Sequence, residues 1–195
     1  RDRFSFIFQV REQSSPGGNG HAIVQAYDLI KDGPFAVRFC DDIILGHPPV
    51  LWSIIEMFSR YRAPIVLLKQ VPRELVQRFG VVGTENAANN FAVFQGGKVC
   101  LINRIVEKPK VEEAPSNLTI IGGYVLTPSA IGNLKSIADT LPLIADDALP
   151  IAVALQMELI IGGKIYGWEF VGSHLDCGTV ERLKEAEAVL KNRTS

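Results

Sequence analysis

Apolar residues along this chain fall into short continuous runs separated by segments with helical spacing, a pattern typical of strands connected by helices. The runs at residues 4–10, 35–40 and 65–70 are mostly apolar and rich in β-branched or aromatic side chains, so we expect strands there. Residues 21–30 and 50–61 have the spacing of helices. Alternating strands and helices with short connections are typical of a parallel sheet covered by helices. The pattern predicts an α/β, Rossmann-like fold: a mixed, mostly parallel sheet with helices on both faces.

The second half of the chain continues with shorter strands and turns. We expect Gly96-Gly97 to form a hairpin-like turn between strands at residues 91–94 and 98–102. Further strands are expected at residues 118–126 and 164–170, and further helices at residues 145–155 and 181–191. Because no internal repeat, low-complexity tract or long linker interrupts this pattern, we expect residues 1–195 to form a single domain.

Composition and charge narrow the range of partners. The 195 residues carry 20 Lys and Arg against 21 Asp and Glu, so no net positive charge attracts the chain to nucleic acid or to an anionic membrane. No apolar run approaches the roughly 18–20 residues of a membrane-spanning helix. The three cysteines are an odd number without the spacing of a metal site, which indicates reduced thiols. We therefore expect a cytoplasmic protein that binds neither nucleic acid nor membrane.

Acidic residues follow two of the expected strands. Asp41 and Asp42 come directly after the strand at residues 35–40, and Asp176 follows a later strand by a short loop. Ligands of α/β sheets bind beyond the carboxyl ends of the strands. Two distant carboxylates that converge on Mg²⁺ can neutralise the charge that develops during nucleotidyl transfer. The alternative is that Asp41 and Asp42 only end a strand and face water, and that Asp176 belongs to a turn.

Two further segments carry groups suited to a phosphorylated ligand. Residues 17–20 form a Gly-rich loop that leads into a helix, where backbone amides can approach an anionic or planar ligand closely. In the segment Glu107-Lys108, the lysine offers a positive charge to a phosphate, and the glutamate can accept hydrogen bonds from sugar hydroxyls. The alternatives are an ordinary flexible turn for the loop and a solvated charged turn for Glu107-Lys108.

The order of the motifs carries more information than any single one. The chain contains, in sequence, GGNGHA (residues 17–22), DD (41–42), RFGVVG (78–83), IVEKPK (105–110), APSNLTIIGGYVLTP (114–128) and DCG (176–178). Over nearly its whole length, the chain thereby resembles the bacterial UTP–glucose-1-phosphate uridylyltransferases, a family of sugar-phosphate nucleotidyltransferases. The resemblance implies attack of a glucose 1-phosphate oxygen on the α-phosphorus of UTP, which forms UDP-glucose and releases pyrophosphate.

The resemblance also implies roles for individual residues. Asp41 and Asp176 match the family's two acids at a magnesium site, and together with Lys108 they would form the catalytic centre. The positions that match the uracil contacts of the family are Gln13 and Gly18. The positions that match the contacts to glucose and its phosphate are Gly80, Glu107, Lys108 and Gly122.

One family motif has no counterpart in this sequence. The family opens with a βα unit whose Gly-rich loop, of the form GxGTRxLP, binds the triphosphate, and residues 4–10 match a strand well inside the fold. We therefore expect the first βα unit to be missing, an edge of the sheet to be exposed, and the chain to associate into a homo-oligomer. The alternatives are a non-catalytic remnant or oligomeric module that binds a nucleotide sugar, and a related thymidylyl- or guanylyltransferase.

Overall fold

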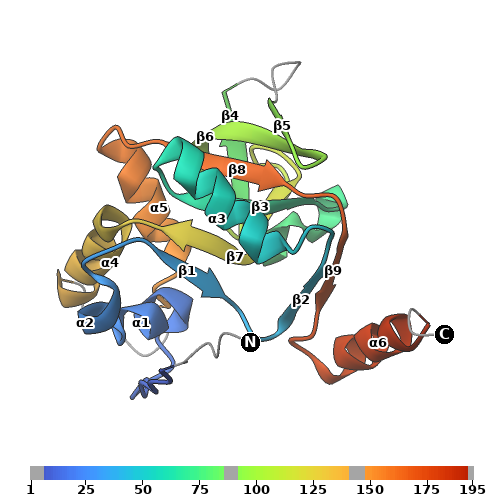
Figure 1. The fold of residues 1–195 in the computed structure, drawn as a ribbon, viewed down its shortest axis with the longest axis horizontal. Helices are drawn as coiled ribbons and strands as arrows, with labels where there is room; N and C mark the ends of the chain where they lie inside the picture. The colour runs from blue at the N-terminus through green and yellow to red at the C-terminus, as the bar shows by residue number, and fades with distance from the viewer. Residues whose placement is uncertain (1–6, 86–91, 141–147, 193–195) are drawn as a thin grey trace, which may run out of the picture.

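The computed structural model describes residues 7–85, 92–140 and 148–192 (Figure 1). The first half contains α1 (Gly18–Val24), α2 (Tyr27–Ile30), β1 (Phe35–Arg38), β2 (Asp42–Leu45), α3 (Val50–Tyr61), β3 (Ile65–Gln70), the 3₁₀-helix η1 (Arg73–Arg78) and β4 (Gly80–Thr84). The second half contains β5 (Ala92–Phe94), β6 (Gly97–Glu107), β7 (Leu118–Leu126), α4 (Pro128–Thr140), α5 (Ile151–Ile160), β8 (Ile165–Glu169), β9 (Ser173–Asp176) and α6 (Val180–Lys191).

The central sheet has the strand order β1-β7-β3-β8-β6-β4, and β5 pairs with β6. The α/β class is confirmed, but the expectation of a mostly parallel sheet is wrong for the described strands. Only β3 and β8 pair in parallel, and the other pairings are antiparallel. The reason is that β7 lies antiparallel between β1 and β3. Alternating strands and helices correctly gave β1 and β3 the same direction, but they could not show that another strand separates them.

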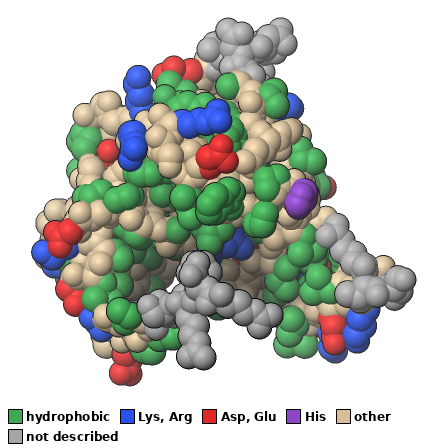
Figure 2. Space-filling model, viewed as in Figure 1, with side chains coloured by type: hydrophobic (Ala, Val, Ile, Leu, Met, Phe, Trp, Pro, Cys, Tyr) green, Lys and Arg blue, Asp and Glu red, His purple; other side chains and the backbone are tan. Residues whose placement is uncertain are grey.

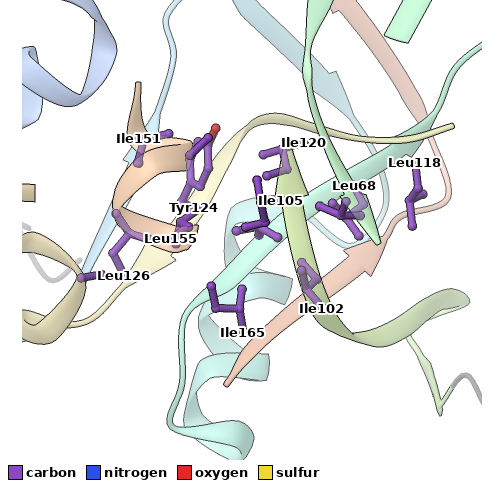
Figure 3. Packing of buried hydrophobic residues seen from close by; sticks show 14 of the residues in the cluster. Leu68, Ile102, Ile105, Leu118, Ile120, Tyr124, Leu126, Ile151, Leu155 and Ile165 are labelled. Atoms are coloured by element: carbon purple, nitrogen blue, oxygen red, sulfur yellow. The ribbon is translucent and has the colours of Figure 1, made fainter. Parts of the chain in front are cut away.

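Two apolar layers hold helices against both faces of this sheet, as expected. Successive side chains of β3 point to opposite faces, so Ile65 and Leu67 pack with α3 while Val66 and Leu68 face the layer that α5 covers. Figure 3 shows the second layer, where Ile151 and Leu155 of α5 lie against side chains of the sheet. Both faces are thus buried, which gives the sheet edge that carries the candidate residues a rigid support.

A second, two-stranded sheet extends from the main body. β2 and β9 pair antiparallel, and Asp42 lies directly opposite Asp176 in the register. In Figure 1 these strands run side by side and lead to α6, which stands apart from the central sheet. This ladder brings the two acidic motifs together although most of the chain separates them.

The observed elements agree with the sequence most closely where the apolar pattern is strongest. α3, β3 and β7 have the predicted bounds. The predicted helix at residues 21–30 is divided into α1 and α2, and the predicted strand at residues 35–40 ends at Arg38. β1 is also half-exposed, because it lies at the end of the sheet. The homo-oligomer remains a prediction.

Other boundaries differ for local reasons. Residues 7–10 form no strand and are exposed, and residues 4–6 of that predicted strand lie outside the described residues. The hairpin turn is Gln95-Gly96, one residue earlier than expected, and both residues have positive φ, at 47° and 79°. α5 begins only after Pro150, because proline is tolerated at the start of a helix and not in its interior. Residues 145–147 of that predicted helix lie outside the described part of the chain.

Four elements were not predicted at all, namely β2, η1, α4 and β9, and no bounds were predicted for β4. β2 and β9 are four residues long and half-buried, so they carry no clear alternation.

Of the helices that the described residues form, none is long and apolar enough to cross a membrane.

Candidate active site

A cavity of about 210 Å³ lies where the central sheet meets the β2–β9 ladder. Six of the residues selected from the sequence line it: Asp41, Gly80, Glu107, Lys108, Gly122 and Asp176. Gln13 and Gly18 do not line the cavity, although the next residue, Asn19, does. Segments that lie far apart in the sequence therefore supply acids, a lysine and two glycines to one cavity.

The two acids proposed to hold a cation face the same point. Asp41 precedes β2, and its carbonyl oxygen accepts a hydrogen bond of 2.7 Å from the backbone N–H of Cys177. If a Cβ were added to Gly178, it would lie 3.2 Å from Asp176 Oδ1 and 3.5 Å from Asp41 Oδ2. The carboxylates thus flank the small space above this glycine, an arrangement that suits a shared cation.

Asp42 has a different role from its neighbour. Its Oδ1 is hydrogen-bonded to Nε2 of His174, and its Oδ2 accepts a 3.0 Å bond from the backbone N–H of Gly122. Arg38 adds bonds of 2.9 Å to the carbonyl oxygens of Gly122 and Asp42. Asp42 therefore ties the β2–β9 ladder to β7. The sequence showed the two adjacent acids, but it contained no signal that this one would pair with His174.

Basic residues surround Asp176. Its Oδ1 accepts a 2.9 Å bond from the backbone N–H of Gly178, and its Oδ2 is ion-paired with Arg182. Arg78 lies 3.6 Å from the same Oδ2. Arg78 opens the motif RFGVVG, but the sequence assigned no role to either arginine, because their relation to Asp176 depends on where η1 and α6 pack.

The backbone conformation of Lys108 is set by neighbouring strands. Lys108 adopts a left-handed conformation with φ of 45°, and its N–H donates a 3.0 Å bond to the carbonyl oxygen of Phe79. A non-glycine residue is uncommon in this region. Gly80 lies opposite Glu107 in the register, and a Cβ on Gly80 would come within 3.1 Å of Glu107 Oε2. Glycine at this position therefore leaves room for the glutamate carboxylate beside the cavity.

The cavity wall also changes the protonation equilibria of two of its acidic groups. Glu107 is exposed to solvent, but the atoms of the cavity wall beside it partly desolvate its carboxyl group and raise its pKa above the ordinary value of 4.5, while the charge of Lys108 opposes this rise. Burial raises the pKa of the Tyr124 phenol as well, and the negative charges of Glu107 and Asp42 add to the effect. Tyr124 therefore faces the cavity as a neutral hydroxyl.

Replacement of Glu107 by glutamine is expected to change how stability depends on pH. An acid with a raised pKa in the folded state favours folding most when it is protonated, so its contribution to stability falls as pH rises above about 4.5. The Glu107→Gln variant should therefore gain stability relative to the wild type as pH rises above about 4.5, and the gain should be small because solvent screens this exposed side chain. Urea unfolding across this range measures the difference, with Glu112→Gln, an exposed acid nearby, as the control. Equal pH slopes for wild type and Glu107→Gln would contradict the prediction.

The residues that match uracil contacts form a separate cluster beside the cavity. The side chain of Gln13 directs Nε2 to the carbonyl oxygen of Gly18, at 3.1 Å, and to Nδ1 of His21, at 2.9 Å. Gly18 has φ of 86°, which favours glycine. Asn19 joins this cluster to α5, because its Oδ1 accepts a 2.8 Å bond from the backbone N–H of Ile151.

Comparison with known proteins defines the class. The sequence profile described as "Nucleotidyl transferase" matches residues 2–191, and the chain belongs to this family. It is 36% identical over 181 residues to a UTP–glucose-1-phosphate uridylyltransferase of Pseudomonas aeruginosa, in an alignment that covers 92% of this chain and 60% of that protein. It is also 36% identical over 125 residues to the uridylyltransferase YngB of Bacillus subtilis, covering 64% of this chain and 39% of that relative.

Solved structures agree with this placement. A UDP-glucose pyrophosphorylase complexed with UDP-glucose superposes with a TM-score of 0.78 at 32% identity, covering 94% of this chain and 64% of that one. An apo UDP-glucose pyrophosphorylase superposes with a TM-score of 0.79 at 34% identity, with coverages of 94% and 63%. The family expected from the motifs and the Rossmann-like α/β fold expected from the pattern of strands and helices are thus confirmed. The chain spans about 60% of the length of the first of these curated relatives.

Proposed function

We propose that this chain forms the sugar-nucleotide site of a uridylyltransferase that makes UDP-glucose and pyrophosphate from UTP and glucose 1-phosphate. The observation that carries the proposal is that Asp41, Lys108 and Asp176, from three distant segments, line one cavity. The names of the relatives and of the superposed structures support the choice of uracil and glucose.

The donor set suits magnesium. Asp41 and Asp176 offer hard carboxylate oxygens to one point. The described residues contain no group of three or more His, Cys, Asp or Glu side chains that could hold a metal, so these two carboxylates would be the protein's ligands. Mg²⁺ commonly binds through one or two carboxylates and completes its coordination with substrate phosphates and water. When bound, Mg²⁺ would neutralise phosphate charge as it develops during transfer.

The remaining residues would bind and orient the substrates. Lys108 places a positive charge in the cavity for a phosphate group, and Glu107 beside it can accept hydrogen bonds from sugar hydroxyls. Gln13 directs Nε2 toward its own loop, so its Oε1 is the atom offered to the uracil N–H. In such a transfer the protein contributes position and charge, and no covalent intermediate with the protein forms.

Calorimetry with UDP-glucose and Mg²⁺ tests the proposal. We expect binding to the wild type, and about tenfold weaker binding to Lys108→Ala, since one charge-assisted phosphate contact is lost. Lys110→Ala, which removes an exposed lysine two residues away, is the matched control and should bind like the wild type. No heat with the wild type at millimolar UDP-glucose would contradict the proposal.

Two further measurements separate the alternatives. Competition by dTDP-glucose and GDP-glucose distinguishes a uridylyltransferase from a thymidylyl- or guanylyltransferase. A pyrophosphate-release assay with UTP and glucose 1-phosphate separates a catalytic chain from one that only binds the nucleotide sugar.

A further inference from the structure

Asp176 lies on a wall that two cavities share. Besides the cavity already described, a groove of about 310 Å³ runs between α6 and the body of the molecule. Arg78, Phe79, His174 and Asp176 line both spaces, whereas Arg182 lines only the groove. The carboxylate of Asp176 is thus open to a cation on the cavity side, while α6 supplies a guanidinium from the groove side.

α6 is attached to the body with little apolar burial. Ala186 is its one fully buried residue, whereas Val180, Leu183 and Val189 are 63%, 53% and 39% exposed. Figure 2 shows hydrophobic side chains on the surface in this part of the molecule, at the lower right, where α6 lies in Figure 1. Because apolar packing contributes so little, the ion pair between Arg182 and Asp176 is a principal contact of this helix.

The charges around Asp176 oppose a further cation. The side chains of Arg182 and Asp176 are only 29% and 28% exposed, so solvent screens their attraction incompletely. Arg78 adds a second guanidinium 3.6 Å from the same Oδ2. A divalent ion at Asp176 would meet two positive charges that already partly neutralise its ligand, and it would weaken the hold of Asp176 on Arg182.

We propose that Arg182 is a built-in counter-ion of Asp176, so that binding of a divalent cation at the site and docking of α6 on the body oppose each other. The inference rests on the proposed function, because it uses the magnesium site at Asp41 and Asp176. The coupling is reciprocal. Docking of α6 lowers the affinity for the metal by the same factor by which the bound metal lowers the equilibrium constant for docking of α6. Arg182 is thus a residue that sets metal affinity without contacting the substrate.

Titration of the whole chain with Mn²⁺ alone, followed by electron paramagnetic resonance, tests the proposal. Arg182→Gln should bind Mn²⁺ about tenfold more tightly than the wild type, the effect of one lost charge-assisted contact. Arg182→Lys keeps the charge and should stay close to the wild type. The matched control is Lys184→Gln, which makes the same charge change at an exposed position of the same helix and should have little effect.

Hydrogen exchange provides a second readout that does not depend on activity. Amides of α6 should exchange faster in the wild type when Mg²⁺ is added, and equally fast with or without Mg²⁺ in Arg182→Gln. Unchanged or weaker Mn²⁺ binding in Arg182→Gln would overturn the proposal and indicate that Arg182 only orients the carboxylate. If neither protein binds Mn²⁺, the proposal also fails, whereas calorimetry with UDP-glucose still decides the proposed function separately.

Discussion

Replacement of Gly122 by alanine is expected to lower the free energy of unfolding by about 3 kcal/mol, the combined cost of overpacking a buried strand and of losing a buried hydrogen bond. A Cβ at this position would overlap Asp42 Oδ2 and lie 2.9 Å from Cβ of Phe39. β7 is buried along its whole length and paired on both sides, so it cannot move away from the clash. The bond from Gly122 N–H to Asp42 would break, and the link between the central sheet and the β2–β9 ladder would weaken.

Urea unfolding measures this effect, and a second glycine provides the control. Gly132 lies inside α4, and a Cβ there would meet nothing within 4 Å. Gly132→Ala should therefore raise stability by about 0.5–1 kcal/mol, the usual gain in a helix interior. If the clash with Asp42 is the cause, Asp42→Ala combined with Gly122→Ala should cost less than the sum of the single changes. A Gly122→Ala variant as stable as the wild type would show that this interpretation is wrong.

The sequence predicted best those features that depend on local pattern. α3 has clear apolar periodicity, β3 begins with a continuous run of four apolar residues, and β7 is mostly apolar or small, so their bounds agree with the structure. Strand order and register depend on contacts between distant segments, and the sequence could not show that β7 separates β1 from β3. Residues 7–10 have strand-like composition but form no strand, because a strand also needs a neighbouring strand to pair with.

Much of the candidate site could be found because its motifs follow a recognisable order. Asp41, Lys108 and Asp176 were selected in this way, and they line one cavity. The supporting contacts had no such signal. The bond between Asp42 and His174 joins residues 132 positions apart, and the pairing of Arg182 with Asp176 depends on how α6 docks. The first contact could be identified only from the register of β2 with β9, and the second only from the position of α6.

Replacement of Asp41 by asparagine is expected to remove the magnesium dependence of UDP-glucose binding. The amide keeps the shape of the side chain but lacks the charge that attracts a divalent cation. Binding to Asp41→Asn in Mg²⁺ should fall by about tenfold or more, the effect of losing one charged ligand. It should then equal binding of the wild type in EDTA. Asp32→Asn, which changes an exposed acid outside the cavity, is the control and should keep the response to Mg²⁺.

The adjacent acid makes this experiment specific. Asp41 is exposed, and its hydrogen bond in the structure is made by its backbone carbonyl oxygen. The free energy of unfolding of Asp41→Asn should therefore lie within about 0.5 kcal/mol of the wild-type value. Asp42 accepts the N–H of Gly122 and pairs with His174, so Asp42→Asn should lose stability. These two results would show that Asp41 binds the cation and that the neighbouring Asp42 stabilises the fold. An Asp41→Asn variant that retains the full response to Mg²⁺ would remove Asp41 from the metal site and, with it, the main support for the proposed chemistry.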